Sequence, residues 1–201
     1  GRGMTVAEVL DAVEPDRPFY DNSGGGVTIS GGEPTTQADF LLELLRALRE
    51  RKIHTAVETC GYFNDALIPR LCAHTDLFLY DLKHPDPETH RRCTGVSNQK
   101  ILENFKSTLT ATGREKVLPR IPLIPGVTAL AEPLSAILDF IESAGYRGEV
   151  HLMPYNRLAK TKYEKIGRGS HYRDLGELTD DDIEKLIVLV QKRRFTAVCN
   201  R

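Results

Sequence analysis

Residues 27–34 read Val-Thr-Ile-Ser-Gly-Gly-Glu-Pro, and they combine the end of a strand with the start of a tight turn. The β-branched run predicts a short strand that ends abruptly at Gly31 and Gly32. Two adjacent glycines let the backbone turn tightly and approach another molecule closely, because neither carries a Cβ atom. Glu33 adds a carboxylate and Pro34 stiffens the exit. This stretch therefore predicts a strand that ends at a ligand site.

The composition is that of an ordinary globular protein. The chain has 201 residues, of which 40% are hydrophobic and 27% are charged, and its formal net charge is −1. This balance argues against a nucleic-acid surface or a polybasic membrane patch. Every apolar run is far shorter than the roughly 18 residues of a transmembrane helix, and residues 1–4 lack a signal-peptide core. We therefore expect a cytoplasmic protein without a nucleic-acid or membrane partner.

Strand-like and helix-like segments alternate along the chain. The expected strands are 27–30, 54–57, 77–80, 117–121, 150–153 and 195–198, and the expected helices lie near 5–14, 40–48, 65–74, 98–112, 134–144 and after 179. Segment 16–26 is polar and glycine-rich, so we expect a loop there. Strands separated by helices indicate βαβ units and a parallel sheet. Without a linker-like stretch, we predict a single domain over residues 1–201, either an open doubly wound sheet or an incomplete (β/α) barrel.

The carboxyl ends of parallel strands are where α/β proteins place their sites. Five expected strand ends carry polar or ionisable residues: Glu33, then Glu58 and Thr59, then Asp81 and Lys83, then Arg120, and finally Asn156. The carboxylates suit an amine or a metal cation, whereas Lys and Arg suit a carboxylate. A zwitterion, such as the amino-acid end of a small molecule, would satisfy both sets. The glycine spacing matches neither a P-loop nor a dinucleotide fingerprint, which argues against ATP and NAD.

Several motifs follow one another in a characteristic order. They are Gly-Gly-Glu-Pro at 31–34, Glu-Thr-Cys-Gly at 58–61, Asp-Leu-Lys at 81–83, Thr-Gly-Val-Ser-Asn at 94–98, Arg-Ile-Pro-Leu-Ile-Pro-Gly at 120–126 and Met-Pro-Tyr-Asn at 153–156. Together they resemble the radical S-adenosylmethionine enzymes that activate glycyl radical enzymes, the family of pyruvate formate-lyase activating enzyme. The resemblance runs over about residues 4–195. It implies a partial parallel (β/α) barrel of the radical-SAM type, without the region of the first strand.

The resemblance also implies roles for the strand-end residues. Gly31, Gly32 and Glu33, followed by Pro34, would hold the amino group of S-adenosylmethionine, and Lys83 would meet its carboxylate. The nucleoside or an incoming protein loop would be faced by Arg120 and Asn156. A monovalent cation would lie at Glu58, Thr59 and Asp81. This chain departs from the family in two of these residues, because the family usually has Asp in place of Glu58 and His in place of Asn156.

The family's [4Fe–4S] cluster is bound by a Cys-x3-Cys-x2-Cys run near the N-terminus, and this sequence contains no such run. Its cysteines are Cys60, Cys72, Cys93 and Cys199, and we expect them to be reduced and mostly buried. We therefore expect an N-terminally truncated barrel that lacks iron–sulfur ligands and radical activity. By resemblance, the partners would be a glycyl radical enzyme, such as a formate acetyltransferase, and a flavodoxin-type reductant.

Two other functions remain open at this point. The chain could be a cluster-less module that only binds S-adenosylmethionine or the partner protein, or an aldolase-like barrel in which Lys83 forms a Schiff base. Loss of the first βα element would expose a strand edge, so we expect low stability or self-association through that edge. His84 and His90 flank a proline-rich turn and are expected to be solvated.

Overall fold

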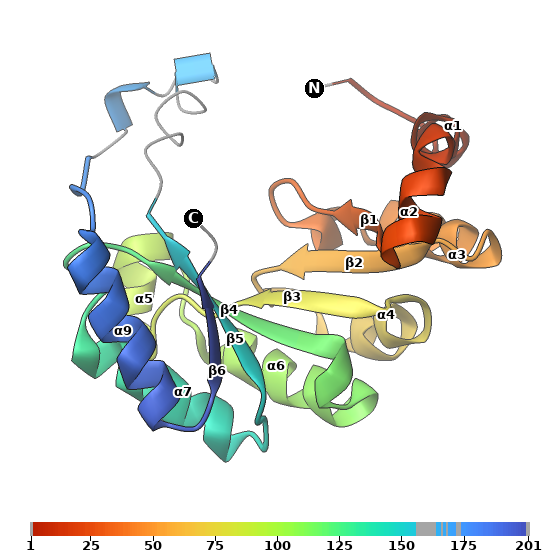
Figure 1. Ribbon diagram of the computed structural model, residues 1–201. Helices are drawn as coiled ribbons and strands as arrows, with labels where there is room; N and C mark the ends of the chain where they lie inside the picture. The colour runs from red at the N-terminus through yellow and green to blue at the C-terminus, as the bar shows by residue number, and fades with distance from the viewer. Residues whose placement is uncertain (1, 156–163, 166, 168, 172–173, 200–201) are drawn as a thin grey trace. The chain divides into compact units, whose positions relative to one another are not determined.

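The structure is a computed structural model that describes residues 2–155, 164–165, 167, 169–171 and 174–199 (Figure 1). The chain divides into two compact units. The first consists of Gly1–Asp81 and Gln99–Leu118, and the second of Leu82–Asn98 and Pro119–Arg201. The single domain expected over residues 1–201 stays a prediction.

The first unit contains three parallel strands with their helices. Strand β2 (His54–Thr59) pairs with β1 (Gly26–Ile29) on one side and with β3 (Leu77–Asp81) on the other. The α-helices are α1 (Val6–Val13), α2 (Arg17–Ser23), α3 (Ala38–Glu50), α4 (Ile68–His74) and α6 (Gln99–Thr112). Short 3-10 helices are η1 (Glu14–Asp16), η2 (Pro34–Gln37), η3 (Asp65–Leu67) and η4 (Arg114–Lys116).

The second unit repeats the pattern. Strand β5 (Glu149–Pro154) pairs in parallel with β4 (Val117–Leu123) and with β6 (Thr196–Cys199), and the first two residues of β4 belong to the first unit. Its helices are α5 (Pro87–Thr94), α7 (Ala131–Ser143), α9 (Asp180–Lys192) and the 3-10 helix η5 (Gly169–His171). None of the helices in the described residues is long and apolar enough to cross a membrane.

The strands follow chain order in the sheet, β1-β2-β3-β4-β5-β6, so that β1 and β6 are its edges. At least one α-helix lies between each pair of successive strands. This alternation arises because parallel neighbours need a crossover connection, which a helix provides. The predicted α/β class with a parallel sheet is therefore confirmed.

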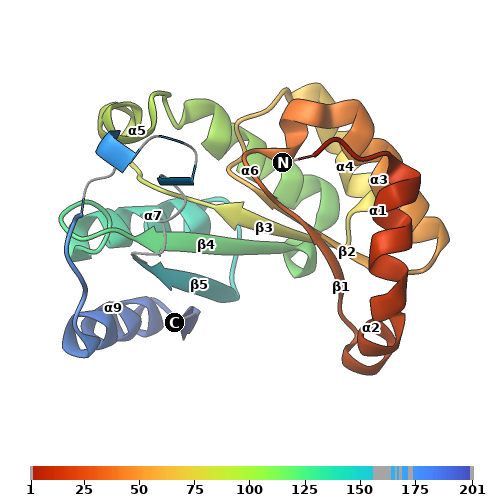
Figure 2. The same ribbon diagram turned by 90° about the horizontal axis from the view of Figure 1, so that it is seen from above.

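The core of the first unit shows why α3 forms where it does. Leu44 and Leu48 lie one turn apart on its buried face, and they pack with Leu10 of α1 and with Ile53. Figure 2 shows α1 and α3 on the same side of β1. Each buried leucine stabilises the fold by about 1.5–3 kcal/mol relative to exposure. The predicted amphipathic helix near residues 40–48 is confirmed.

Three local expectations were wrong. Segment 16–26 contains α2, which ends at Gly24 in the left-handed conformation with φ of +68°. The proline-rich turn contains α5, because Asp86 caps it by accepting a hydrogen bond of 2.7 Å from Thr89 N. His90, which we expected to be solvated, is only 2% exposed, and its Nδ1 lies 2.7 Å from the carbonyl oxygen of Val96. A proline in the first turn of a helix is favourable, so its presence did not exclude a helix.

Candidate functional site

The turn after β1 leaves its backbone accessible. Gly31 has a φ of +113°, a conformation that favours glycine, and both Gly31 and Gly32 are exposed. A Cβ atom added to either glycine would meet no heavy atom within 4 Å. The close approach that the glycines predicted is therefore sterically possible.

The Glu33 carboxylate joins the end of β1 to the end of β2. Its Oε1 accepts hydrogen bonds from Thr35 Oγ1 (2.7 Å), Thr35 N (3.3 Å) and Thr59 Oγ1 (2.9 Å). Its Oε2 accepts one from Cys60 N at 2.8 Å. Such bonds to an ionised group are stronger than neutral ones, so they fix the turn. Glu33 is half-buried, and Oε2 keeps acceptor capacity for a further donor.

The loop after β2 is held by buried side chains of the same unit. Asn104 of α6 is 2% exposed and donates hydrogen bonds of 2.9 Å to the carbonyl oxygens of Gly61 and Phe63. Gly61 has a φ of +77° and lies against Tyr80, whose hydroxyl donates to Ile101 O at 3.1 Å. Burial raises the pKa of the Tyr80 hydroxyl well above its usual range, so this group stays a donor.

The strand register places the side chains of the three residues expected at a cation, Glu58, Thr59 and Asp81, on two different faces of the sheet. Glu58 pairs with Leu79, so Glu58 and Asp81 lie on the same face of the sheet, whereas Thr59 lies on the opposite face. The Thr59 hydroxyl donates to Glu33 and accepts from Gly61 N at 2.9 Å. If Thr59 coordinates a cation that lies beside the carboxylates of Glu58 and Asp81, it would therefore do so through its main-chain carbonyl oxygen. Within the described residues no group of three His, Cys, Asp or Glu side chains could hold a metal ion.

In the second unit, Asn98 fixes the loop that follows Lys83. Its Nδ2 donates hydrogen bonds to His84 O at 2.8 Å and to Pro85 O at 2.7 Å, and the side chain is buried. The Leu82 amide, next to Lys83, donates to Arg120 O in β4 at 2.9 Å. Lys83 and Arg120 are both half-buried. The structure thus brings the backbone of the Asp-Leu-Lys motif next to that of Arg120.

The loop after β4 is also held by hydrogen bonds from a buried side chain. Thr128, which is 2% exposed, donates from Oγ1 to the Pro122 carbonyl and accepts from Ile124 N at 2.7 Å. Ile124 O in turn accepts from the amides of Val127, Thr128 and Ala129 at 3.0 Å each. The motif at residues 120–126 was recognised, but the threonine that holds this loop was missed.

Not every predicted site residue is placed. Asn156 lies outside the described residues. The residues that sequence reasoning missed are the fastening groups Thr35, Asn104 and Thr128. Thr35 lies directly after the Gly-Gly-Glu-Pro motif, and this adjacency was the one available signal. Asn98 belongs to a motif that was recognised, but its role was not assigned.

The four cysteines do not form an iron–sulfur site. They form no disulfide and belong to different elements: Cys60 follows β2, Cys72 lies in α4, Cys93 in α5 and Cys199 in β6. Three are half-buried and Cys93 is exposed, so the expectation that most are buried was too strong. Burial raises the pKa of the Cys72 thiol. The described cysteines therefore do not fit the three neighbouring thiolates that a [4Fe–4S] cluster needs.

Comparison of the sequence with known families gives one match that covers most of the chain. The sequence model of the Radical SAM superfamily matches residues 1–141. Two similar relatives come from Oleidesulfovibrio alaskensis. The choline trimethylamine-lyase activating enzyme is 35% identical over 97% of this chain and 63% of its own length. The isethionate sulfite-lyase activating enzyme is 42% identical over 90% of this chain and 57% of its own length. The chain thus spans about three fifths of these relatives.

Solved structures give a consistent result. A domain of pyruvate-formate lyase-activating enzyme from Bacteroides vulgatus ATCC 8482 is 25% identical, with a TM-score of 0.73 over 89% of this chain and 100% of that one. Streptococcus suis SuiB bound to S-adenosylmethionine is 16% identical, with a TM-score of 0.71 over 100% of this chain and 44% of its own length. The second likeness concerns the fold alone. Together they support the predicted partial barrel.

Proposed function

The chain belongs to the radical SAM superfamily, and from this premise we propose that it is the S-adenosylmethionine-binding barrel of a glycyl radical enzyme activating enzyme. Its relatives at 35% and 42% identity carry the name of activating enzymes. The family match also favours this function over a Schiff-base aldolase that uses Lys83.

The observation that carries the proposal is the braced, open turn after β1. In the proposal, main-chain groups of Gly31 and Gly32 receive the ammonium group of S-adenosylmethionine, and Oε2 of Glu33 adds a negative charge. The four hydrogen bonds to Glu33 support this role, because they fix the turn before a ligand arrives. Pro34 stiffens the exit from the turn. Lys83 pairs with the carboxylate of the ligand.

The remaining site residues have finer roles in the proposal. Arg120 and Asn156 face the nucleoside or the incoming loop of the partner protein. A monovalent cation is held by the carboxylates of Glu58 and Asp81 and by the main-chain carbonyl of Thr59. The shared face of Glu58 and Asp81 supports this assignment.

The whole protein, in this proposal, generates a glycyl radical on a partner such as a formate acetyltransferase in the cytoplasm, with a flavodoxin-type reductant. A [4Fe–4S] cluster, where bound, would supply the electron for cleavage of the sulfonium, and the four cysteines of this chain do not fit it. This chain binds and orients S-adenosylmethionine, but its own cysteines do not hold the cluster. We therefore expect the 201-residue chain alone to bind S-adenosylmethionine without cleaving it.

The binding test uses isothermal titration calorimetry of the chain with S-adenosylmethionine. Gly32→Ala adds a methyl group in open space at a residue without positive φ, so the fold is kept while the approach of the ligand is blocked. We expect its affinity to fall by about tenfold or more, on the order of 1.4 kcal/mol. Gly3→Ala is the matched control, because a Cβ there also meets nothing within 4 Å, and its affinity should be unchanged.

Equal binding by both glycine variants would contradict the role of the turn, and failure of the unaltered chain to bind would contradict the proposed function. A second measurement follows 5′-deoxyadenosine after the chain has been supplied with iron, sulfide and a reductant. Its formation above background would contradict the expected inactivity of the isolated chain. For the whole protein, the readout is the electron paramagnetic resonance signal of a glycyl radical on the partner.

A further inference from the structure

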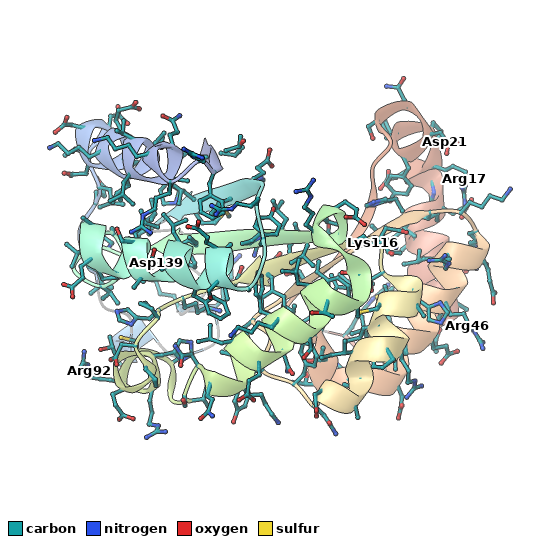
Figure 3. The ribbon with its side chains drawn as sticks, turned by 90° about the horizontal axis from the view of Figure 1, so that it is seen from below. Arg17, Asp21, Arg46, Arg92, Lys116 and Asp139 are labelled. Carbon is teal, nitrogen blue, oxygen red and sulfur yellow. The ribbon has the colours of Figure 1, made fainter. Side chains whose placement is uncertain are left out.

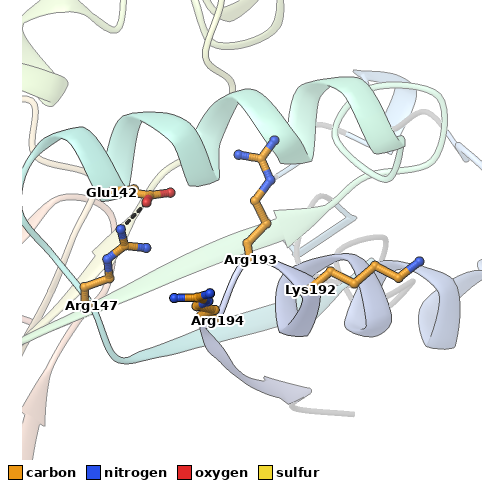
Figure 4. Close-up of a pocket in the computed structure, with 5 residues that line it drawn as sticks. All are labelled: Glu142, Arg147, Lys192, Arg193 and Arg194. Atoms are coloured by element: carbon orange, nitrogen blue, oxygen red, sulfur yellow. Dashed lines mark hydrogen bonds and ion pairs between the residues drawn. The ribbon is translucent and has the colours of Figure 1, made fainter.

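A charged pocket of about 370 Å³ lies in the second unit, and Figure 4 shows the five residues that line it. They are Glu142, Arg147, Lys192, Arg193 and Arg194. Glu142 lies in the last turn of α7, and Lys192 ends α9. The other residues lie in the turns that lead into β5 and β6. The pocket is therefore at the amino ends of these strands, whereas the proposed S-adenosylmethionine residues lie at carboxyl ends.

The cations around the pocket are only partly neutralised. Arg147 forms an ion pair with Glu142, and Arg193 forms one with Asp139 of α7. Figure 3 labels Asp139. Lys192 and Arg194 have no acidic partner among the described residues. Four cations thus face two carboxylates, which leaves an excess of two positive charges.

The backbone of Arg194 is unusual for an arginine. It has a φ of +62°, and its amide donates to Gln191 O at 2.9 Å in the turn that ends α9. The turn that ends α7 has the same arrangement, but there the left-handed residue is Gly145. Glycine is the favoured residue in this turn because it has no Cβ. An arginine is therefore less favourable for the backbone than a glycine would be, as is Lys52 in the equivalent turn after α3.

Figure 4 draws an ion pair from Glu142 to Arg147 and none to Arg194, although both arginines line the pocket. Like charges that line one pocket repel one another, and an anion between them would offset this repulsion. The negative end of a helix stabilises cations in the last turn, and this accounts for Lys192. It does not account for Arg194, which lies beyond the helix end and costs backbone strain.

From these observations we propose that the pocket binds a small phosphate-bearing anion, with Arg194 and Lys192 as its principal ligands and Arg147 as a third. A guanidinium group can donate two parallel hydrogen bonds to two oxygens of one phosphate, so the arginines that line this pocket suit a phosphate ligand. The volume lies within the range of about 300–1,000 Å³ that is usual for small-molecule sites. Free polyphosphate and a nucleoside diphosphate share this chemistry.

The test is isothermal titration calorimetry of the chain with pyrophosphate and with ADP at constant ionic strength. Arg194→Gly removes the charge and relieves the left-handed strain, so the fold is kept. We expect a loss of affinity of about tenfold or more, and a smaller loss for Arg194→Lys, which keeps the charge but not the planar fork of donors. Glu142→Gln should strengthen binding severalfold, because it frees Arg147 from its ion pair.

Lys52→Gly is the matched control. Lys52 has a φ of +57° in the equivalent turn after α3, so its replacement relieves the same kind of strain away from the pocket. Both glycine variants should melt a few degrees higher without ligand, but Lys52→Gly should bind the anion as the unaltered chain does. Tighter binding of ADP identifies a nucleotide site, and equal affinities identify recognition of phosphate alone. Absence of binding by both probes, or unchanged binding by Arg194→Gly, overturns the proposal.

Discussion

Glu33 accepts four hydrogen bonds in the turn after β1, and three other polar side chains act similarly after other strands. Asn104 holds the loop after β2, Asn98 the loop after β3 and Thr128 the loop after β4. All three are at most 2% exposed. A buried donor that loses its partner costs about 1–3 kcal/mol, so each of these contacts strongly favours one loop conformation. Single residues thus pre-organise the strand ends at which the site is proposed.

The first prediction concerns Gly61. An added Cβ would lie 2.1 Å from the Tyr80 hydroxyl oxygen, and the φ of +77° is unfavourable for alanine. We expect Gly61→Ala to lower the free energy of unfolding by about 2–4 kcal/mol in urea denaturation. Gly95→Ala is the control, since Gly95 has a φ of +88° but no atom within 4 Å of its Cβ position. It should cost only about 1 kcal/mol. Equal losses in the two variants would show that the contact with Tyr80 is unimportant.

The second prediction concerns Asn98. Asn98→Asp replaces the two-donor amide with acceptor oxygens that face the carbonyls of His84 and Pro85. The free energy of unfolding should fall by about 2–3 kcal/mol. If the loop positions Lys83 as proposed, S-adenosylmethionine affinity measured on the folded variant should also fall. Asn22→Asp, at an exposed position of α2, is the control and should change neither quantity. An Asn98→Asp variant as stable as the unaltered chain would refute the fastening role.

At the scale of elements, local sequence predicted most strands and helices because their hydrophobic periods are clear. The leucines of α3 and the β-branched residues of β1 are examples. Helix α2 was missed because its polar composition resembles a loop, and α5 was missed because Pro87 was taken as a turn signal. The contact of Glu33 with Thr59 could not be predicted, because it joins residues 26 positions apart. Motif order indicates the strand ends at which the site is proposed, but it did not predict the contacts that fix those strand ends.

The third prediction concerns the start of α9. Thr179 caps the helix by accepting from Asp182 N at 3.1 Å, and Asp182 Oδ2 accepts from Thr179 Oγ1 at 2.7 Å. Thr179→Ala should therefore lower the free energy of unfolding by about 1 kcal/mol near neutral pH. Thr179→Ser keeps the hydroxyl and is the control. Urea denaturation of the three proteins gives the comparison, and equal stability of the alanine variant would contradict the capping role.

The same cap has a pH dependence with a definite sign. The hydrogen bond from the Thr179 hydroxyl, with a further one from its amide, lowers the pKa of the Asp182 carboxyl in the folded chain. The stabilisation is therefore complete above the unfolded pKa of about 3.9 and is lost as the pH falls through the lower folded value. Asp182→Asn should be less stable than the unaltered chain at neutral pH, and this difference should shrink in acid. A difference that does not change with pH would exclude ionisation of Asp182 as its cause.

At the scale of the molecule, the sheet has two edge strands, β1 and β6. The main-chain groups on the open side of β1 have no strand partner among the described residues, and β1 is only four residues long. An open edge is a template for pairing with another chain, so self-association of the 201-residue chain through β1 remains our prediction. The alternative edge, β6, is also four residues long, and among the described strands it pairs with β5 alone.

A lysine substitution in each edge strand can show which strand mediates self-association. Thr28 in β1 and Thr196 in β6 are both exposed, and lysine on an edge strand opposes pairing with a second copy. We expect the chain to show concentration-dependent dimers in sedimentation velocity, and Thr28→Lys to weaken them about tenfold, on the order of 1.4 kcal/mol. Thr196→Lys should leave the dimer unchanged. Loss of the dimer only with Thr196→Lys would assign the contact to β6, and a monomer at every concentration would refute self-association.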